Sequence, residues 1–190
     1  MWEKLLQWDR ETLIYLNGLG NEPYDGFWSV VTKFPTWTPF FLLILVVFFL
    51  KYSKREAFVQ ILFLLAIAGC VAILSGLTKE WVGRLRPCND PEINTLIRVL
   101  RKPSDFSFFS GHASTSFSVV ILAYLFLREQ WKWSFVLFIW PLLFSYSRIY
   151  LGVHFPLDII TGALIGGIFA LLFYRFHLKF IRRDSMSTHP

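Results

Sequence analysis

The stretch AFVQILFLLAIAGCVAILSGLT, residues 57–78, decides the fold of this chain. It carries no charged side chain, and a helix needs about 20 mostly apolar residues to cross a bilayer. The stretch therefore predicts a membrane-spanning helix. Four further uncharged runs are slightly shorter and are expected to use flanking residues, with Lys and Arg side chains extending outward; these runs are 34–50, 113–127, 133–147 and 159–174.

The composition of the whole chain also indicates a membrane protein. Of the 190 residues, 55% are hydrophobic and 17% are charged, whereas a soluble domain carries about 25% charged residues. We therefore expect one all-α domain over residues 1–190, an integral membrane helical bundle with five or six transmembrane helices. Residues 1–23 predict an amphipathic helix that either lies in the membrane interface or packs on the bundle. This segment is the sixth crossing in the alternative count.

Basic residues flank the apolar runs and indicate the orientation of the chain. They cluster at 51–56, at 128–132 and in the C-terminal tail. With five crossings these places fall on one side of the membrane, which the positive-inside tendency makes cytoplasmic. The polar segments 79–112 and 147–158 then meet at the opposite face. The net charge of +6 thus reflects membrane anchoring, and no basic stripe interleaved with aromatic residues indicates nucleic-acid binding.

The segment 147–158 contains a candidate nucleophile. His154 and Asp158 lie four residues apart, and Pro156 suits the first turn of a helix. A carboxylate on one nitrogen of an imidazole fixes the tautomer and makes the other nitrogen a better base or nucleophile. Arg148, six residues before His154, indicates an anionic substrate. Taken alone, Asp158 also fits a helix-start carboxylate stabilised by the helix dipole.

The segment 79–112 is expected to form the loop of the same site, with a short extra helix within 88–109. Lys79 and Arg86 stand at its start, with Arg84 between them. Two or three cations would neutralise a phosphoryl group and the charge that develops in its transition state. Taken alone, these cations also fit side chains that extend from a helix end to the membrane surface.

The end of this segment carries Ser110, Gly111 and His112, directly before an apolar run. Glycine lets the backbone approach a ligand closely, and the N–H groups that open a helix bind anions. A histidine at this position can donate a proton to a leaving oxygen. An N-cap serine followed by a histidine at the membrane surface is the plainer interpretation.

Together the three groups of residues resemble the signature of the type 2 phosphatidic acid phosphatase superfamily, which is K-x6-R-P, then P-S-G-H, then S-R-x5-H-x3-D. The chain reads Lys79-x6-Arg86-Pro87, then Ser110-Gly111-His112, then Ser147-Arg148-x5-His154-x3-Asp158. It departs at one position, where Phe109 replaces the proline before Ser-Gly-His. This change alters the rigidity of the loop but removes no chemical group.

The resemblance implies a role for each residue. His154 attacks phosphorus and forms a phosphohistidine, Asp158 orients it, and His112 protonates the leaving oxygen and later activates water. The implied phosphate-binding residues are Lys79, Arg86, Ser110, Gly111 and Arg148. The resemblance implies no metal and no cofactor, and no metal-ligand spacing such as C-x-x-C or H-E-x-x-H occurs in the chain.

The predicted function is metal-independent hydrolysis of a lipid phosphate or diphosphate held in the bilayer. Undecaprenyl diphosphate, phosphatidylglycerol phosphate, phosphatidic acid and lipid A phosphate are the candidate substrates. From its size and this resemblance we expect the chain in a bacterial inner membrane, with its site facing the periplasm. A vanadate-dependent haloperoxidase-like enzyme is one alternative. A lipid-phosphate transporter or binding protein, which would need the cations but not the His154–Asp158 pair, is another.

The four histidines are expected to fall into two groups. His112 and His154 should face each other across a polar pocket at one membrane face. His177 and His189 lie outside the pattern, near the end of the last span and in the tail. Both are predicted to be surface residues.

Overall fold

The computed structural model describes residues 1–187 of the chain, with side chains described through residue 180. All its regular elements are helical in this part of the chain. The α-helices are α1 (Trp2–Gly18), α2 (Asp25–Val31), α3 (Thr38–Lys51), α4 (Lys54–Val82), α5 (Gly111–Leu127), α6 (Ile139–Tyr150) and α7 (Pro156–Ser187). Short 3₁₀ turns join them: η1 (Glu22–Tyr24), η2 (Phe34–Trp37), η3 (Pro87–Asn89) and η4 (Ser134–Phe138).

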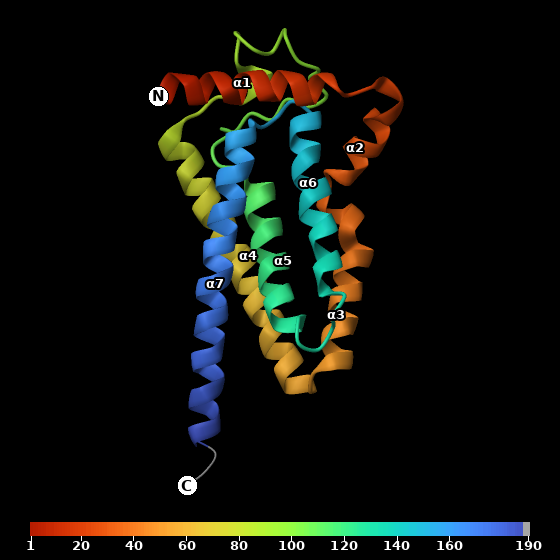
Figure 1. Cartoon of the computed structure of the whole chain (residues 1–190), viewed down its shortest axis with the longest axis vertical. Coiled ribbons are helices and arrows are strands. Elements are labelled where there is room, and N and C mark those ends of the chain that lie inside the picture. The colour runs from red at the N-terminus through yellow and green to blue at the C-terminus, as the bar shows by residue number, and fades with distance from the viewer. Residues whose placement is uncertain (188–190) are drawn as a thin grey trace.

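The helices α3 to α7 form an elongated bundle, and α1 lies across one of its ends (Figure 1). The loop after α4 and the α6–α7 turn lie at the end that α1 covers. The α3–α4 and α5–α6 turns lie at the other end, as does the end of α7. The two polar segments that were expected to meet at one face of the bundle therefore do so.

Three helical stretches are long and apolar enough to cross a membrane. They are 34–51, 54–89 and 156–180, with mean hydropathies of 1.8, 2.7 and 2.0. The stretches 111–127 and 134–150 are apolar but shorter. An all-helical integral membrane bundle is therefore confirmed, while the number of crossings, five or six, stays a prediction.

Proline and glycine set the boundaries of the first two long stretches. Pro35 lies in η2 and Pro39 in the first turn of α3, so the apolar run from residue 34 starts as a 3₁₀ turn and becomes α-helical only at Thr38. Helix α4 ends at Gly83, which has a φ of 64° and donates its N–H to the Lys79 carbonyl oxygen at 2.9 Å. Lys79 therefore lies in the last turn of α4 rather than in the loop.

The loop between α4 and α5 contains no α-helix, and the short extra helix expected within residues 88–109 is limited to a 3₁₀ turn at the start of that range. Only the 3₁₀ turn η3 forms there. Side chains satisfy the backbone instead: Asn89 donates to the Pro103 carbonyl oxygen at 2.7 Å, and the Ser107 hydroxyl donates to the Leu85 carbonyl oxygen at 3.2 Å. These bonds hold the loop as a compact irregular segment.

Glycines on α7 allow it to pack very closely against α5. A β-carbon on Gly162 would lie 2.7 Å from the Ser110 carbonyl oxygen, and one on Gly166 would lie 2.5 Å from the Ser114 carbonyl oxygen. Small residues four apart let two helix backbones approach in a membrane. On α5 the buried hydroxyls of Ser114 and Ser118 donate to carbonyls of their own helix. The contact therefore buries no unpaired hydroxyl of these two serines.

Helix α1 is attached to the end of the bundle by polar side chains on one face. Asp9, Leu13 and Asn17 follow one another at intervals of four residues and are fully buried. The Asn17 amide donates to the carbonyl oxygens of Ile149 and Tyr150, both at 3.0 Å, which lie at the end of α6. The helix therefore packs on the bundle, which is one of the two arrangements expected for residues 1–23.

The expectation that His177 is a surface residue is wrong. Its side chain is only 4% exposed, and its ring lies against Phe63 and Phe126, with centroids 5.1 and 4.6 Å away. Aromatic residues of neighbouring helices cover this part of α7, so proximity to the end of the span does not give access to water. His189 lies outside the described residues.

The close approach of α7 to α5 predicts different effects for two adjacent glycines. Gly166→Ala places a methyl group against the α5 backbone, and such overpacking costs about 1–3 kcal/mol. Gly167→Ala is the matched control, because its β-carbon would meet nothing nearer than the Ile121 methyl group at 3.5 Å. We expect thermal unfolding in detergent to show a lower midpoint for Gly166→Ala and an unchanged or higher one for Gly167→Ala. Equal midpoints would contradict this packing.

Candidate active site

The candidate site lies at the end of the bundle that α1 covers, and His154 is its central residue. His154 belongs to the α6–α7 turn and is 1% exposed. Its Nδ1 lies 3.3 Å from Oδ2 of Asp158, which also accepts the Phe155 N–H at 2.9 Å. Because α7 begins at Pro156, Asp158 stands in the first turn of that helix and reaches back to the histidine.

The partners of His154 define which ring nitrogen carries the proton. Its Nε2 lies 3.0 Å from a guanidinium nitrogen of Arg86, which can only donate. The neutral ring therefore holds its proton on Nδ1, facing the Asp158 carboxylate. This leaves the lone pair of Nε2 on the side where the cations gather.

Three cations, those of Arg86, Arg148 and Lys79, act on His154 through their charge, and Arg86 contacts its Nε2. Arg86 is buried and also donates to the Val153 carbonyl oxygen at 2.9 Å. Arg148 is 2% exposed and donates to the Thr32 hydroxyl, but its Nε has no hydrogen-bond partner among the described residues. Lys79 extends to the same place from the last turn of α4. A buried guanidinium N–H without an acceptor indicates a position for an anion.

One carboxylate, Asp105, already lies between two of these cations. Its Oδ2 accepts the Lys79 ammonium at 2.6 Å, and both of its oxygens accept a guanidinium nitrogen of Arg86 at 2.9 Å. Burial alone would raise the pKa of Asp105, but the bonds from Arg86 and Lys79 outweigh it and hold the pKa below its usual range. Asp105 is therefore an anion at any working pH.

The Ser110-Gly111-His112 segment starts α5 beside the histidine. Ser110 is the N-cap, its hydroxyl accepts the Ala113 N–H at 3.4 Å, and its own N–H donates to the Asp158 carbonyl oxygen at 3.0 Å. A β-carbon on Gly111 would lie 3.0 Å from the Ser75 hydroxyl, so a larger residue would be crowded there. The plainer interpretation of Ser110, as an N-cap, therefore holds in this structure.

His112 lies against two phenylalanine rings at the start of α5, and these two rings also contact each other. It stacks on Phe144 with ring centroids 4.7 Å apart, and Phe34 of η2 lies 5.4 Å away. The charges of Arg148 and His154 act on it, so the two histidines share one electrostatic environment. The segments 79–112 and 147–158 thus bring both histidines to the same end of the bundle.

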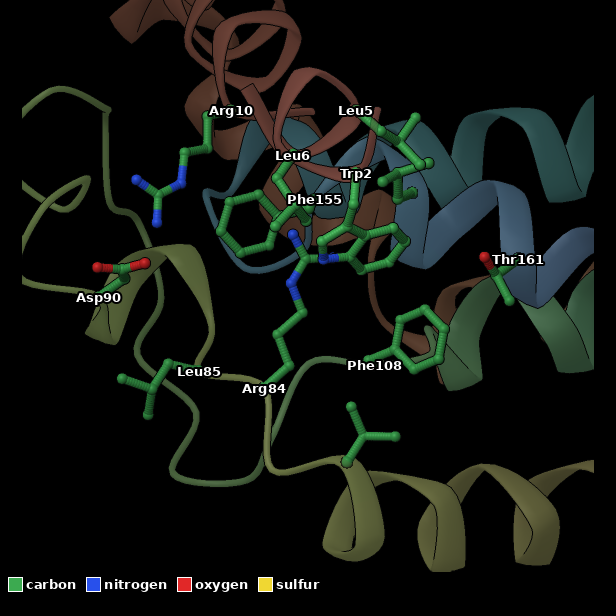
Figure 2. A pocket seen from close by; sticks show the side chains of 12 residues that line it. Trp2, Leu5, Leu6, Arg10, Arg84, Leu85, Asp90, Phe108, Phe155 and Thr161 are labelled. Carbon is green, nitrogen blue, oxygen red and sulfur yellow. The ribbon is translucent and has the colours of Figure 1, made fainter. Parts of the chain in front are cut away.

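Arg84 does not join the cations around the phosphate position, as its place between Lys79 and Arg86 suggested. It donates to Oδ1 of Asp158 at 2.7 Å and to Oδ2 of Asp9 at 2.6 Å, behind the histidine. Its guanidinium carbon lies 3.9 Å from the centre of the Phe155 ring (Figure 2). Arg84 therefore neutralises two buried carboxylates and connects α1 to the site.

Burial and charge shift two further pKa values in the site. Burial lowers the pKa of His154 well below its ordinary value, and the positive charges of Arg86, Arg148 and Lys79 lower it further. Burial also raises the pKa of Asp9, although hydrogen bonds from Arg84 and the Leu157 N–H oppose this. His154 is therefore neutral in the resting site.

Two hollows adjoin the site from different sides. A hollow of about 410 Å³ is lined by Lys79, Asp105 and Gly111, and residues of α4, α5 and η2 form its walls. A second hollow, of about 650 Å³, is lined by Arg84 and by the first turns of α1 (Figure 2). Its apolar wall residues are Trp2, Leu5, Leu6, Val82, Leu85, Phe108, Phe155 and Leu157. Of the three cations that act on His154, Lys79 lines the first hollow and none lines the second.

The structure brings all eight candidate residues from the sequence to one end of the bundle. They are Lys79, Arg86, Ser110, Gly111, His112, Arg148, His154 and Asp158. The sequence analysis missed Asp9 and Asp105, and it misplaced Arg84. Asp9 could have been found from its spacing to Leu13, since a carboxylate on the buried face of an amphipathic helix needs a partner.

Comparison with known proteins gives consistent matches. The family model PAP2 superfamily matches residues 57–182. A lipid A 4′-phosphatase from Bacteroides thetaiotaomicron is 33% identical over 99% of this chain and 85% of its own length. An undecaprenyl-diphosphatase from Sulfolobus acidocaldarius is 32% identical over 80% of each chain.

A solved structure has the same fold. The crystal structure of a transmembrane PAP2-type phosphatidylglycerolphosphate phosphatase from Bacillus subtilis superposes with a TM-score of 0.71 over 93% of this chain and 87% of that one, at 22% identity. The family match covers more than half of the sequence, including the segments that supply the cations and both histidines. The chain therefore belongs to the PAP2 superfamily and is an integral membrane phosphatase.

Proposed function

We propose that this protein hydrolyses the phosphate ester of a membrane lipid, without a metal, through a phosphohistidine on His154. The observation that carries the proposal is the contact of Arg86 with Nε2 of that histidine, together with the charges of Arg148 and Lys79 that act on the same ring and an Arg148 Nε that is buried without a partner among the described residues. Three fixed cations beside a neutral imidazole match the needs of phosphoryl transfer, which are positioning and charge stabilisation.

The proposed reaction has two steps. The Nε2 lone pair of His154 attacks phosphorus, the bond to the lipid oxygen breaks, and protonated His112 gives its proton to that oxygen. Asp158 stabilises the positive charge that then develops on the His154 ring. In the second step His112 takes a proton from water, whose oxygen attacks phosphorus and releases His154. The charge of a bound phosphate would favour the protonated form of His112 in the first step.

The lateral hollow suggests how a lipid reaches these residues. Its walls are the sides of α4, α5 and η2, so a phosphate could enter from the membrane while the acyl chains stay between helix and lipid. With five crossings, the basic 51–56 and 128–132 loops would face the cytoplasm and the site would face outward. In a bacterial inner membrane this face is periplasmic.

Lipid A phosphate is the first substrate we propose. The relative named lipid A 4′-phosphatase aligns with 99% of this chain, whereas the undecaprenyl-diphosphatase aligns with 80%. A match over nearly the whole chain includes α1, which the site uses through Asp9. Undecaprenyl diphosphate is the second substrate to test.

The first test is phosphate release by purified protein in detergent against lipid A, undecaprenyl diphosphate, phosphatidylglycerol phosphate and phosphatidic acid. We expect release that survives a chelator and is lost in His154→Ala, because this variant lacks the attacking nitrogen. His177→Ala is the matched control and should retain turnover, since His177 lies near the other end of α7. Release that needs a divalent metal, or that persists in His154→Ala, would contradict the mechanism.

The environment of His154 predicts how activity depends on pH. Because burial and the neighbouring cations lower its pKa, the nucleophile stays neutral at pH values where an exposed histidine is protonated. We therefore expect that, in the pH profile of kcat/KM, the fall in activity on the acid side occurs below pH 6.5. Lys79→Met removes one of the charges and should move this fall to higher pH, at a lower overall rate. Titration of the substrate affects both enzymes equally, so a fall at the same pH in both would contradict the assignment.

The position of Arg84 predicts a role in holding Asp158. Arg84→Gln leaves two buried carboxylates without a cation, and breaking a buried pair costs about 3–5 kcal/mol. We expect a large loss of stability and, in the folded fraction, a lower kcat with little change in KM. Arg10→Gln is the control, because its pair with Glu92 is exposed and should contribute little. Arg84→Gln with a normal kcat would leave Arg84 a purely structural residue.

A further inference from the structure

The residue Asp105 belongs to none of the three motifs, yet its carboxylate contacts two of the cations that the motifs supply. Its carboxylate spans Lys79 and Arg86 through four contacts of 2.6 to 3.2 Å. These two side chains are the cations to which the proposed function assigns the substrate phosphate. A planar carboxylate held by a guanidinium fork and an ammonium has the hydrogen-bond pattern of a bound phosphate.

We infer that the Asp105 carboxylate occupies the phosphate position of the resting site and competes with substrate and product phosphate for Lys79 and Arg86. The inference rests on the proposed function, because it takes these cations as the phosphate donors. It makes Asp105 a residue that sets the affinity of the site for anions.

The exposure of the three side chains shows which of them can leave. The side chain of Asp105 is 47% exposed, whereas those of Lys79 and Arg86 are 14% and 4% exposed. The carboxylate can therefore turn into water, while the cations have no comparable alternative environment. An arriving phosphate would displace the carboxylate and leave the cations in place.

The loop around Asp105 allows this turn without unfolding. The Pro103 carbonyl oxygen accepts a bond from Asn89, and the Ser107 N–H donates to the Arg84 carbonyl oxygen at 2.9 Å. The chain is thus fixed on both sides of Asp105. Arg86 also holds the Asp105 carbonyl oxygen, at 2.9 Å, so the backbone can stay in place while the side chain changes rotamer.

Competition of this kind has a consequence for turnover. A site with three cations and no internal anion would hold the released phosphate tightly and slow its departure. When the product phosphate leaves, the Asp105 carboxylate returns to Lys79 and Arg86. It then restores part of the stabilisation that these two cations lose with the phosphate. A phosphate dianion carries more charge than the carboxylate, so substrate can still displace it.

A purely structural role for Asp105 makes the opposite prediction. If the carboxylate only holds Lys79 and Arg86 in position for phosphate, its removal should weaken phosphate binding. If it competes with phosphate, its removal should strengthen binding. The sign of one affinity change therefore separates the two roles.

The experiment titrates inorganic phosphate against wild type, Asp105→Asn and Asp105→Ala in detergent at constant ionic strength. Binding is read from the rise of the thermal unfolding midpoint with phosphate concentration and from inhibition of lipid hydrolysis. We expect the apparent Kd of phosphate to fall roughly threefold to tenfold in both variants, the range for one partly exposed charge-assisted contact. Asn could still accept one hydrogen bond, so Ala should show the larger change.

Asp90→Asn is the matched control, because it removes a carboxylate from the same loop that contacts neither Lys79 nor Arg86. It should bind phosphate as wild type does. Unchanged or weaker phosphate binding in both Asp105 variants would overturn the inference. Failure of wild type to release phosphate from any lipid would instead overturn the proposed function, and the midpoint titrations would still show whether Asp105 competes with phosphate.

Discussion

The carboxyl group of Asp158 is the point on which the site depends. Its side chain accepts N–H groups from Arg84 and Phe155 and lies 3.3 Å from His154 Nδ1, while its main-chain oxygen accepts the Ser110 N–H. A buried carboxylate is costly unless donors surround it. Arg84 from the loop after α4 and the Phe155 N–H from the α6–α7 turn satisfy the carboxylate, while the Ser110 N–H from the start of α5 satisfies the main-chain oxygen. The three chain segments that carry the motifs therefore meet at Asp158.

The packing of α7 on α5 makes this arrangement possible. The bond from Ser110 to the Asp158 carbonyl oxygen joins the first turns of the two helices, so their backbones must come close at that level. Gly162, one turn along α7, lies directly against the Ser110 carbonyl oxygen. A larger side chain there would separate the helices at the end of the bundle where His112 and His154 lie. Small residues in the membrane helices therefore determine the geometry of the polar site above them.

The sequence predicted those parts of the structure that depend on local pattern. Uncharged runs predicted the apolar helices, and the spacing of His154 and Asp158 predicted their contact, because Asp158 in the first turn of α7 reaches back to the turn before that helix. The partners of Asp9 and Asp105 were not predictable in this way, since they lie 75 and 26 residues away along the chain. His177 was misjudged because its burial depends on aromatic residues of other helices. Proximity to a span end says nothing about those neighbours.

The two sides of His154 carry opposite charge, and this difference suits the nucleophilic role that we propose for its neutral ring. Behind it, Asp158 lies at Nδ1; in front of it, Arg86 lies at Nε2. In the proposed reaction the carboxylate would stabilise the positive charge on the ring as Nε2 attacks phosphorus, and the cations would stabilise the negative charge on the phosphate oxygens. The stabilisation by the carboxylate and the stabilisation by the cations both increase as the bond to phosphorus forms. Neither requires a charged side chain to change its position. The field is built into the fold before the substrate arrives, so the groups need little reorganisation during the reaction.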